Sequence, residues 1–422
     1  MPGFGRTQQF ARSMSVAAGL LIALVFAALL CDSGAAQSVK AQEHLGNQSG
    51  QKPEVAPSPL PEGSWRFIVS GDSRNCGDIV MPAIAAHSGQ FAPSFYWHLG
   101  DLRAIYKVDE DMAFAAAVNG EFLSCTLYLQ RAWPDFIEHQ IAPFGSVPFY
   151  VGIGNHEVIA PKDRFQFRRQ FAPWLDQPTL HEQRAKDEPG QKKDAVGEPE
   201  APQTYFHWMQ KNVDFVYLDN ASDCFPATQL EWLKRVLEKD ASNSEVKSVV
   251  VGMHESLPDS LANSHSMGDS PVPEARPAGE KAYQMLLAFR AQTHKPVYVL
   301  SSHSHFYLEN IFDTPPLQKK GEPLPGWIVG TGGAERYTLP VPSSAAARQD
   351  VYGYLIGTVA ADGTIQFAFQ EIREPDIPAA TRLEYPATLV HWCFAHNSRN
   401  TDPGAGEITP HCAGPPGPPR CQ

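Results

Sequence analysis

Five apolar runs in this chain each end in a short polar turn that carries aspartate, asparagine or histidine. Runs of this kind, bounded by glycine or serine, are typical of buried β-strands. The clearest covers residues 147–153 and leads directly into Gly154-Asn155-His156-Glu157. A strand end supports such side chains rigidly, and the following loop exposes them. A single polar turn could simply close a core strand, but five of them predict a fold built around a sheet edge that carries chemistry.

The five predicted strands cover residues 65–70, 94–99, 147–153, 247–251 and 296–300, and the turns after them contain Asp72, Asp101, Asn155 with His156, His254, and His303 with His305. Carboxylate, amide oxygen and imidazole are the ligands that hold borderline divalent metals such as Zn, Mn or Fe. Two such ions about 3.5–4 Å apart can clamp a phosphoryl group and activate a water molecule for in-line attack. Strand ends at one sheet edge can deliver these ligands from distant parts of the sequence.

With these turns the chain resembles the calcineurin-like metallophosphoesterase superfamily, and especially its exported purple-acid-phosphatase-like branches. The resemblance covers residues 65–373 and rests on five motifs in the family's order, with a glycine-rich stretch after them. The stretches are Gly71-Asp72-Ser73-Arg74, Gly100-Asp101, Gly154-Asn155-His156-Glu157, Gly252-Met253-His254, Ser302-His303-Ser304-His305 and Gly330-Thr331-Gly332-Gly333. The resemblance implies an α/β (α+β) fold in which a central β-sandwich of two mixed sheets is flanked by helices.

The resemblance also implies a role for each motif residue. Asp101 would bridge two metal ions, whether Fe, Mn or Zn. One ion would be completed by Asn155, His254 and His303, and the other by Asp72 and His305. His156 would bind no metal; it would contact the phosphate and donate a proton to the leaving group.

Two residues depart from the family pattern. Arg74 stands where many members have a metal-binding histidine, and Ala104 stands where purple acid phosphatases have a tyrosine. One site therefore has three recognisable ligands, and the second ion is in doubt unless another residue, such as Asn75, completes it. Arg74 could instead hold the phosphate through its guanidinium fork. Arg103 is as compatible with a phosphate contact as with a surface salt bridge.

These observations predict an exported metal-dependent phosphoesterase that hydrolyses phosphomonoesters by attack of a metal-activated water. One alternative is a phosphodiesterase, and another is a catalytically weak metal-binding protein of the same fold that has lost one metal site. His98, which lies inside a strand, is expected to pack rather than to bind metal.

Composition limits the partners. A formal net charge of -12 argues against general electrostatic binding to nucleic acid or anionic lipid. We expect a small-molecule phosphoester as substrate, and the sequence does not indicate an oligomeric state. Hydrophobic residues make up 43% of the chain, which is enough for a large core.

The N-terminus resembles an export signal. Arginines in a polar start precede the apolar residues 16–30, and small residues follow at 33–36. We predict a signal peptide over residues 1–36 and a periplasmic or secreted protein without a stable membrane span after cleavage. A permanent anchor is the alternative, and Cys31 raises a lipid anchor, although the large Leu30 before it is unusual for a lipoprotein.

The rest of the chain divides by composition. We predict a flexible leader over residues 37–63, a catalytic domain over 64–375, and a Pro- and Cys-rich, irregular extension over 376–422. Helices are expected at 79–86, 109–141, 226–239 and 280–292, a surface loop at 176–202, and a hairpin at 352–370. Six cysteines follow the signal, and their even number predicts disulfides whose pairing the sequence does not give.

Overall fold

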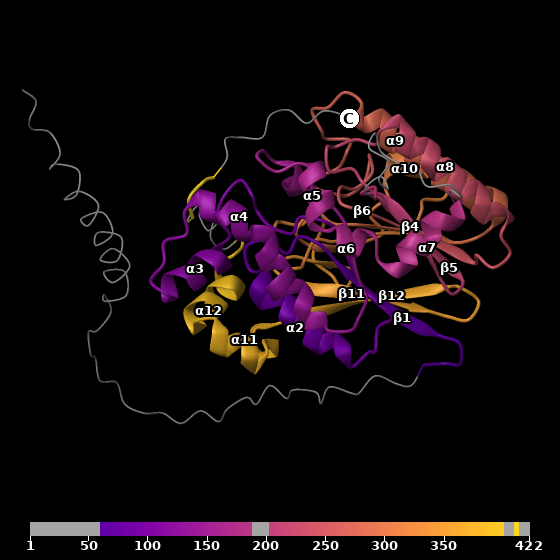
Figure 1. Cartoon of the computed structure of the whole chain (residues 1–422). Helices are drawn as coiled ribbons and strands as arrows, with labels where there is room; N and C mark the ends of the chain where they lie inside the picture. Colours follow the sequence, from indigo (N-terminus) through magenta and orange to yellow (C-terminus); the bar gives the residue numbers. More distant parts are fainter. Residues whose placement is uncertain (1–59, 188–201, 401–408, 413–422) are drawn as a thin grey trace, which may run out of the picture. The chain divides into compact units, whose positions relative to one another are not determined.

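The computed structural model describes residues 60–187, 202–400 and 409–412 (Figure 1). The predicted signal peptide and most of the predicted leader lie outside these residues. A helix that is long and apolar enough to cross a membrane does not occur within the described ranges.

The first sheet has five strands in the order β12-β11-β1-β2-β3. They are β1 (Trp65–Ser70), β2 (Tyr96–His98), β3 (Phe149–Val151), β11 (Tyr352–Val359) and β12 (Ile365–Ile372). β1, β2 and β3 run parallel, whereas β11 pairs antiparallel with β1 and with β12. The carboxyl ends of the three parallel strands therefore point to one edge.

The second sheet has seven strands in the order β10-β8-β9-β7-β6-β5-β4. They are β4 (Phe206–Gln210), β5 (Val213–Leu218), β6 (Ser248–Met253), β7 (Val297–Ser301), β8 (Tyr307–Glu309), β9 (Gly326–Val329) and β10 (Ala347–Arg348). β5, β6, β7 and β9 are parallel, and the pairs at the two ends of the order are antiparallel. Both sheets are thus mixed, as predicted.

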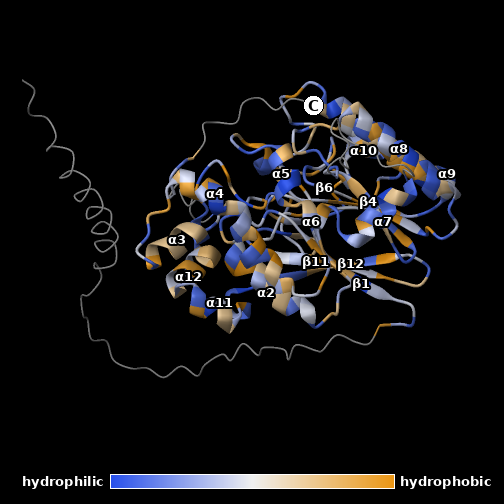
Figure 2. Ribbon diagram, viewed as in Figure 1, coloured by the Kyte–Doolittle hydropathy of each residue, from blue (hydrophilic) through white to orange (hydrophobic). Residues whose placement is uncertain are grey.

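Helices flank the two sheets. They are α2 (Gly77–Gly89), α3 (Glu110–Val118), α4 (Cys125–Phe136), α5 (Arg164–Gln170), α6 (Ala172–Leu175), α7 (Pro178–Asp187), α8 (Ala227–Ser242), α9 (Ala275–Thr293), α10 (Pro315–Gln318), α11 (Ala379–Glu384) and α12 (Ala387–Ala395). A π-helical turn, Ile137–Ile141, extends α4. α8 and α9 lie side by side and alternate apolar and polar residues along their length (Figure 2). In α8, Leu230, Leu233 and Leu237 are buried, which is the amphipathic pattern expected of a helix on a sheet.

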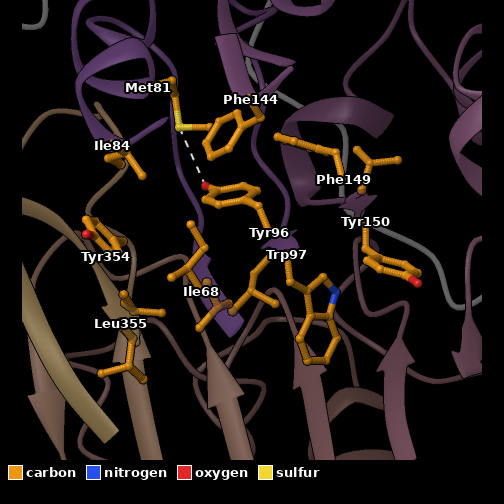
Figure 3. Close-up of a cluster of buried hydrophobic side chains, with 14 of the residues drawn as sticks. Ile68, Met81, Ile84, Tyr96, Trp97, Phe144, Phe149, Tyr150, Tyr354 and Leu355 are labelled. Carbon is orange, nitrogen blue, oxygen red and sulfur yellow. Dashed lines mark hydrogen bonds between the residues drawn. The ribbon is translucent and has the colours of Figure 1, made fainter. Parts of the chain in front are cut away.

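Alternating side chains of the strands fill two different layers of the core. On one face of the first sheet, Tyr96 meets Met81 of α2, and the Tyr96 hydroxyl donates to Met81 Sδ at 3.5 Å (Figure 3). On the opposite face, the ring centroids of Trp97 and Trp208 are 5.2 Å apart, which joins β2 to β4 of the other sheet. Period-two alternation in strands that are buried on both faces therefore produces a β-sandwich with an outer helical layer. The predicted fold class is confirmed.

Two predictions of irregular structure were wrong. Residues 178–187, predicted as loop, form α7, because Leu180 is buried and Arg184 donates to the carbonyl of Leu175. The Pro-rich extension contains α11 and α12, and Pro378 and Pro386 stand just before their first turns, where proline is well tolerated. Residues 188–201, also within the predicted loop, lie outside the described residues.

Among the described residues, two disulfides tie the C-terminal segment to the sandwich. Cys76 pairs with Cys393 of α12, and Cys125 of α4 pairs with Cys412. The sulfur atoms join residues 317 and 287 positions apart in sequence. Both bridges agree with the prediction of disulfides and are compatible with an oxidising compartment. Cys421 lies outside the described residues.

We expect Cys76, Cys125, Cys393 and Cys412 to resist alkylation in protein that is made in an oxidising compartment and denatured without reductant. Loss of a native disulfide typically costs about 2–5 kcal/mol of unfolding free energy, so a reductant should also lower the melting temperature. Peptide mapping after thiol labelling checks the pairing. Reactive thiols at all four positions would refute both bridges.

Candidate metal centre

The five predicted motifs meet at one edge of the sandwich. Asp72 follows β1, Asp101 follows β2, and Asn155 follows β3 in the first sheet; His254 follows β6 and His303 follows β7 in the second. Because these strands are parallel within each sheet, their carboxyl ends lie together, and the loops from the two sheets face one another. The contacts below join residues up to 260 positions apart in sequence.

Four side chains converge on a single point. His254 Nε2 lies 3.2 Å from Asp101 Oδ1, 2.9 Å from Asn155 Oδ1 and 3.1 Å from His303 Nδ1. Asp101, His254 and His303 also form a group whose ligand atoms lie within 4.8 Å of one another. Asn155 and His303 are half-buried, whereas Asp101 and His254 are fully buried, so solvent can reach the point from one side. We call these four residues the central cluster.

The tautomer of His254 indicates that the central cluster suits a cation. His254 Nδ1 lies 3.0 Å from the carbonyl of Leu99, which can only accept, so Nδ1 carries a hydrogen. Nε2 therefore faces the Asp101 and Asn155 oxygens and His303 Nδ1 with either a lone pair or a second proton. Burial opposes the imidazolium charge, but Asp101 beside it raises the pKa of His254 to about 9. A proton there satisfies the same attraction that a metal ion would, and the donor set of carboxylate, amide oxygen and two imidazoles fits a borderline divalent metal.

The backbone of this edge is held in an unusual conformation. Asp72, Asp101 and His303 have φ angles of 58°, 59° and 67°, in the left-handed region that non-glycine residues rarely adopt. Such conformations persist where the surroundings enforce them, and they concentrate at functional sites. Gly154 allows the Asp101 side chain to lie close to the backbone of the next loop, because a Cβ atom at position 154 would lie 2.3 Å from Asp101 Oδ1.

Glu157 fixes the loop that carries Asp101. Its carboxylate accepts from the backbone N–H of Asp101, Leu102 and Gly154 at 2.8–2.9 Å. The glutamate of this motif therefore orients the Asp101 loop rather than joining the central cluster. A side chain that holds a ligand in place matters to a metal site nearly as much as the ligand itself.

The ligands predicted for a second ion are in contact with Arg74. Arg74 Nη2 lies 3.0 Å from His305 Nε2, and Arg74 Nε lies 3.6 Å from Asp101 Oδ2. His305 Nδ1 contacts the carbonyl of Glu335 at 2.5 Å, so Nδ1 carries the hydrogen and Nε2 accepts from the guanidinium. The lone pair that His305 would offer to an ion is thus directed at Arg74.

Arg74 keeps its charge although it is buried. Burial opposes that charge, but Tyr337, Tyr106 and the two aspartates of the edge raise the pKa of Arg74 above its usual value. Asp72 Oδ1 and Asp101 Oδ2 have no hydrogen-bond partner within the described residues, so the guanidinium faces carboxylate oxygens that it does not bond directly. The second position thus combines a fixed positive side chain with the His305 imidazole, which lies 3.3 Å from Asp72 Oδ1.

His156 lies against the Asp101 carboxylate. Its Nδ1 contacts the carbonyl of Ala104 at 2.6 Å, and its Nε2 lies 3.4 Å from Asp101 Oδ2. The carbonyl fixes the hydrogen on Nδ1 and leaves Nε2 as the atom that can exchange a proton. Burial, reinforced by the charge of Arg74, lowers the pKa of His156 to about 4.

Two residues that the sequence suggested for the site form ion pairs or hydrogen bonds with other groups instead. Arg103 is fully buried and pairs with Asp78, Asp111 and Asp135, so it is neither a surface salt bridge nor placed to receive a phosphate. Asn75 donates to Glu110 and accepts from the backbone N–H of Glu335, which leaves its side chain unavailable as a metal ligand.

His98 packs, as expected. It is buried against Phe136 and Phe149, and its Nε2 contacts Ser73 Oγ at 3.0 Å.

Three aromatic residues that the motifs did not indicate border the site. The Tyr337 ring stacks on His305 with centroids 4.0 Å apart, the His265 ring is 5.3 Å from that of His303, and the Tyr106 ring is 5.3 Å from that of His156. All three stand in irregular segments between strands, where no periodic pattern marks them. Only their contacts in the folded chain reveal them.

No family model and no curated protein matches this sequence. Similar solved structures include a purple acid phosphatase from yellow lupin seeds (14% identity, TM-score 0.47, covering 75% of this chain and 53% of that one). Others are PhoD (14%, 0.42, covering 75% and 73%) and a phosphatase from Mycoplasma pneumoniae (13%, 0.35, covering 73% and 93%). The matched part spans about half of the lupin protein. These likenesses are weak, and the proposals below rest on the geometry of the site.

In its motifs and in its two flanked mixed sheets, this chain resembles the calcineurin-like metallophosphoesterases.

Proposed function

We propose that this protein is a metal-dependent phosphoesterase that acts on phosphomonoesters, with one ion held by the central cluster and Arg74 in place of a second. The observation that carries the proposal is the convergence of Asp101, Asn155, His254 and His303 beside a buried guanidinium. A divalent site and a fixed positive charge side by side suit a phosphate dianion. The metal would be Mn, Zn or Fe.

The central cluster, Arg74 and His156 would each have a different role in the reaction. A metal ion in the central cluster would supply Lewis acidity to a phosphoryl oxygen. Arg74 directs donors at the same region and remains charged at every working pH. His156 holds its Nε2 near Asp101, and an arriving phosphate dianion would raise the pKa of this imidazole and let it carry a proton to the leaving group. Tyr106 and Tyr337 lie close enough to Arg74 to favour its charged form.

The proposal is tested by assaying phosphomonoesters and phosphodiesters with protein stripped by chelator and then resupplied with Mn²⁺, Zn²⁺ or Fe²⁺. We expect turnover of monoesters that is lost with the metal and restored by it. Faster turnover of diesters would favour the phosphodiesterase. Stoichiometric metal binding without turnover on any ester would favour a binding protein, a reading supported by the contact between Arg74 and His305.

Replacement of Arg74 by alanine should raise KM or lower kcat for phosphomonoesters by about 10–100-fold, because a hydrogen bond to a charged group contributes about 1.5–3 kcal/mol. Phosphodiesters carry less charge and should lose less. Arg74→Lys is the matched control, since it keeps the charge but not the fork, and should recover part of the loss. Equal losses on both ester classes would exclude a role in recognising the dianion.

We also propose that the protein is exported, with a signal peptide over residues 1–36, a catalytic domain over 64–375 and an extension over 376–422. The apolar N-terminal run and the two disulfides support this division. Mass spectrometry of the N-terminus of protein recovered from cell fractions tests it. A mature chain that begins near residue 37 in the periplasm or medium is expected, and a full-length chain in the membrane would indicate the anchor instead.

A further inference from the structure

A second group of charged side chains lies around Arg103, apart from the residues of the central cluster. The guanidinium is buried and faces four carboxylates, those of Asp78, Asp109, Asp111 and Asp135. One guanidinium among four carboxyl groups leaves more acidic than basic groups in a region where burial makes unpaired charge costly. The two nearest carboxylates, Asp78 and Asp135, both bind Arg103 Nη2.

Each of these two carboxylates has one oxygen directed away from Arg103. Asp78 binds Arg103 through Oδ1, and its Oδ2 is buried with no hydrogen-bond partner within the described residues. Asp135 binds Arg103 through Oδ2, and its Oδ1 lies 3.1 Å from His139 Nδ1. Asp78, Asp135 and His139 thus each offer one ligand atom, and the three atoms lie within 4.8 Å of one another. We call these three residues the outer cluster.

The outer cluster opens into a cavity of about 330 Å³. Asp78 and His139 line the cavity, together with Glu138, Glu384 and Tyr385. His139 Nε2 lies 3.2 Å from Glu384 Oε1. Asp78 is only 1% exposed and its unpartnered oxygen is buried, and Asp78 as a residue lines a space that an ion and its water molecules can enter.

We propose that the outer cluster binds one divalent transition-metal ion, such as Zn²⁺, through Asp78, Asp135 and His139. Two carboxylates and an imidazole are a common ligand set for such ions, and the cavity leaves room for water at the remaining positions. The ion would partner Asp78 Oδ2 and offset the excess of acidic groups around Arg103. It would link α2, α4 and the π-helical turn, which carry the three ligands.

The site is independent of the proposed activity, because none of its residues belongs to the central cluster. Arg103 connects the two regions, since it follows Asp101 by two positions and is held by the same two carboxylates. An ion in the outer cluster would therefore make the protein more resistant to unfolding whether or not it is an enzyme.

The test uses full-length protein stripped of metal and carrying His254→Ala, which disables the central cluster. Zn²⁺ is then titrated and bound metal is counted by mass spectrometry after desalting, with the melting temperature recorded alongside. We expect about one Zn²⁺ per chain and a higher melting temperature with the ion. Adding His139→Gln should weaken this binding by at least about 10-fold, because even loss of an outer partner of a ligand costs about 10–100-fold in affinity.

Glu138→Gln is the matched control, since it removes a carboxylate from the same cavity but not from the outer cluster. Unchanged binding in Glu138→Gln together with weaker binding in His139→Gln supports the site. Equal losses in the two variants would show diffuse attraction only, and no bound Zn²⁺ in His254→Ala would show that protons alone neutralise the cluster; either result overturns the proposal. Asp78→Asn, which keeps an oxygen for Arg103, provides a second variant if His139→Gln folds poorly.

Discussion

Replacement of His254 by alanine is expected to empty the central metal site and to abolish most turnover. His254 Nε2 is the atom that contacts the other three members of the cluster, at 2.9–3.2 Å. Loss of a partner that only orients a ligand already costs about 10–100-fold in metal affinity or activity, so loss of the ligand should exceed about 100-fold. Bound metal and kcat/KM should be measured in a His139→Gln background, so that an ion in the outer cluster does not enter the count.

Ser302→Ala is the matched control for this prediction. Ser302 Oγ lies 3.0 Å from His254 Nδ1, but the carbonyl of Leu99 lies at the same distance and remains in the variant. The imidazole should keep its orientation, and the loss should be about 10-fold or less. Circular dichroism should show both variants folded. Full metal content and turnover in His254→Ala would contradict the assignment of the central cluster.

Replacement of His156 by alanine is expected to lower turnover by about 10²–10⁴-fold, the usual contribution of a general acid, while metal content stays close to that of the native protein. The reason is the position of His156. Its Nε2 lies 3.4 Å from Asp101 Oδ2, but His156 is not part of the central cluster. Esters with very good leaving groups need little protonation and should lose least. Kinetics on a series of aryl phosphates of graded leaving-group pKa checks this.

His156→Gln separates proton donation from simple positioning. The amide of glutamine can place an N–H donor near the position of Nε2, but it cannot release a proton. If His156 is an acid, glutamine should recover little on poor leaving groups. Recovery on good and poor leaving groups alike would assign His156 to phosphate positioning, and a large loss of metal would make it a ligand.

The layered fold could be predicted because its strands are marked locally. Residues 65–70 and 296–300 are apolar and bounded by turn residues, and they form β1 and β7. The hairpin of β11 and β12 turns at Asp362-Gly363, a favoured tight-turn pair. α7 and α11 were missed because they are short and carry few apolar residues, and α12 because its apolar residues surround the helix instead of forming one stripe, so tertiary contacts decide their structure.

The approach of the motif residues to one another followed from their positions at the ends of parallel strands. Asp101 and His254 belong to different sheets, and their side chains still meet at 3.2 Å. The metal ligation itself remains a prediction. What the sequence could not give was the direction of individual side chains, since a loop residue can face either the site or the core.

Arg74 and Arg103 show this limit clearly. Both follow an aspartate at a strand end by two positions, and both are buried. Arg74 turns to His305, 231 positions away, whereas Arg103 turns to carboxylates on α2 and α4. No local sequence pattern distinguishes Arg74 from Arg103, because the residues that bind each guanidinium belong to other elements of the fold. The sequence could therefore name both residues but could not separate a site residue from a structural one.

Diffraction from a crystal grown with Mn²⁺, with anomalous differences recorded near the manganese absorption edge, would locate the bound ions. We expect an anomalous peak bounded by Asp101, Asn155, His254 and His303, with the Arg74 guanidinium on His305 and no peak between Asp72 and His305. A peak at that second position, with Arg74 turned away, would contradict the claim that Arg74 replaces an ion. The absence of a peak in the central cluster, in protein that Mn²⁺ activates, would contradict the metal centre itself.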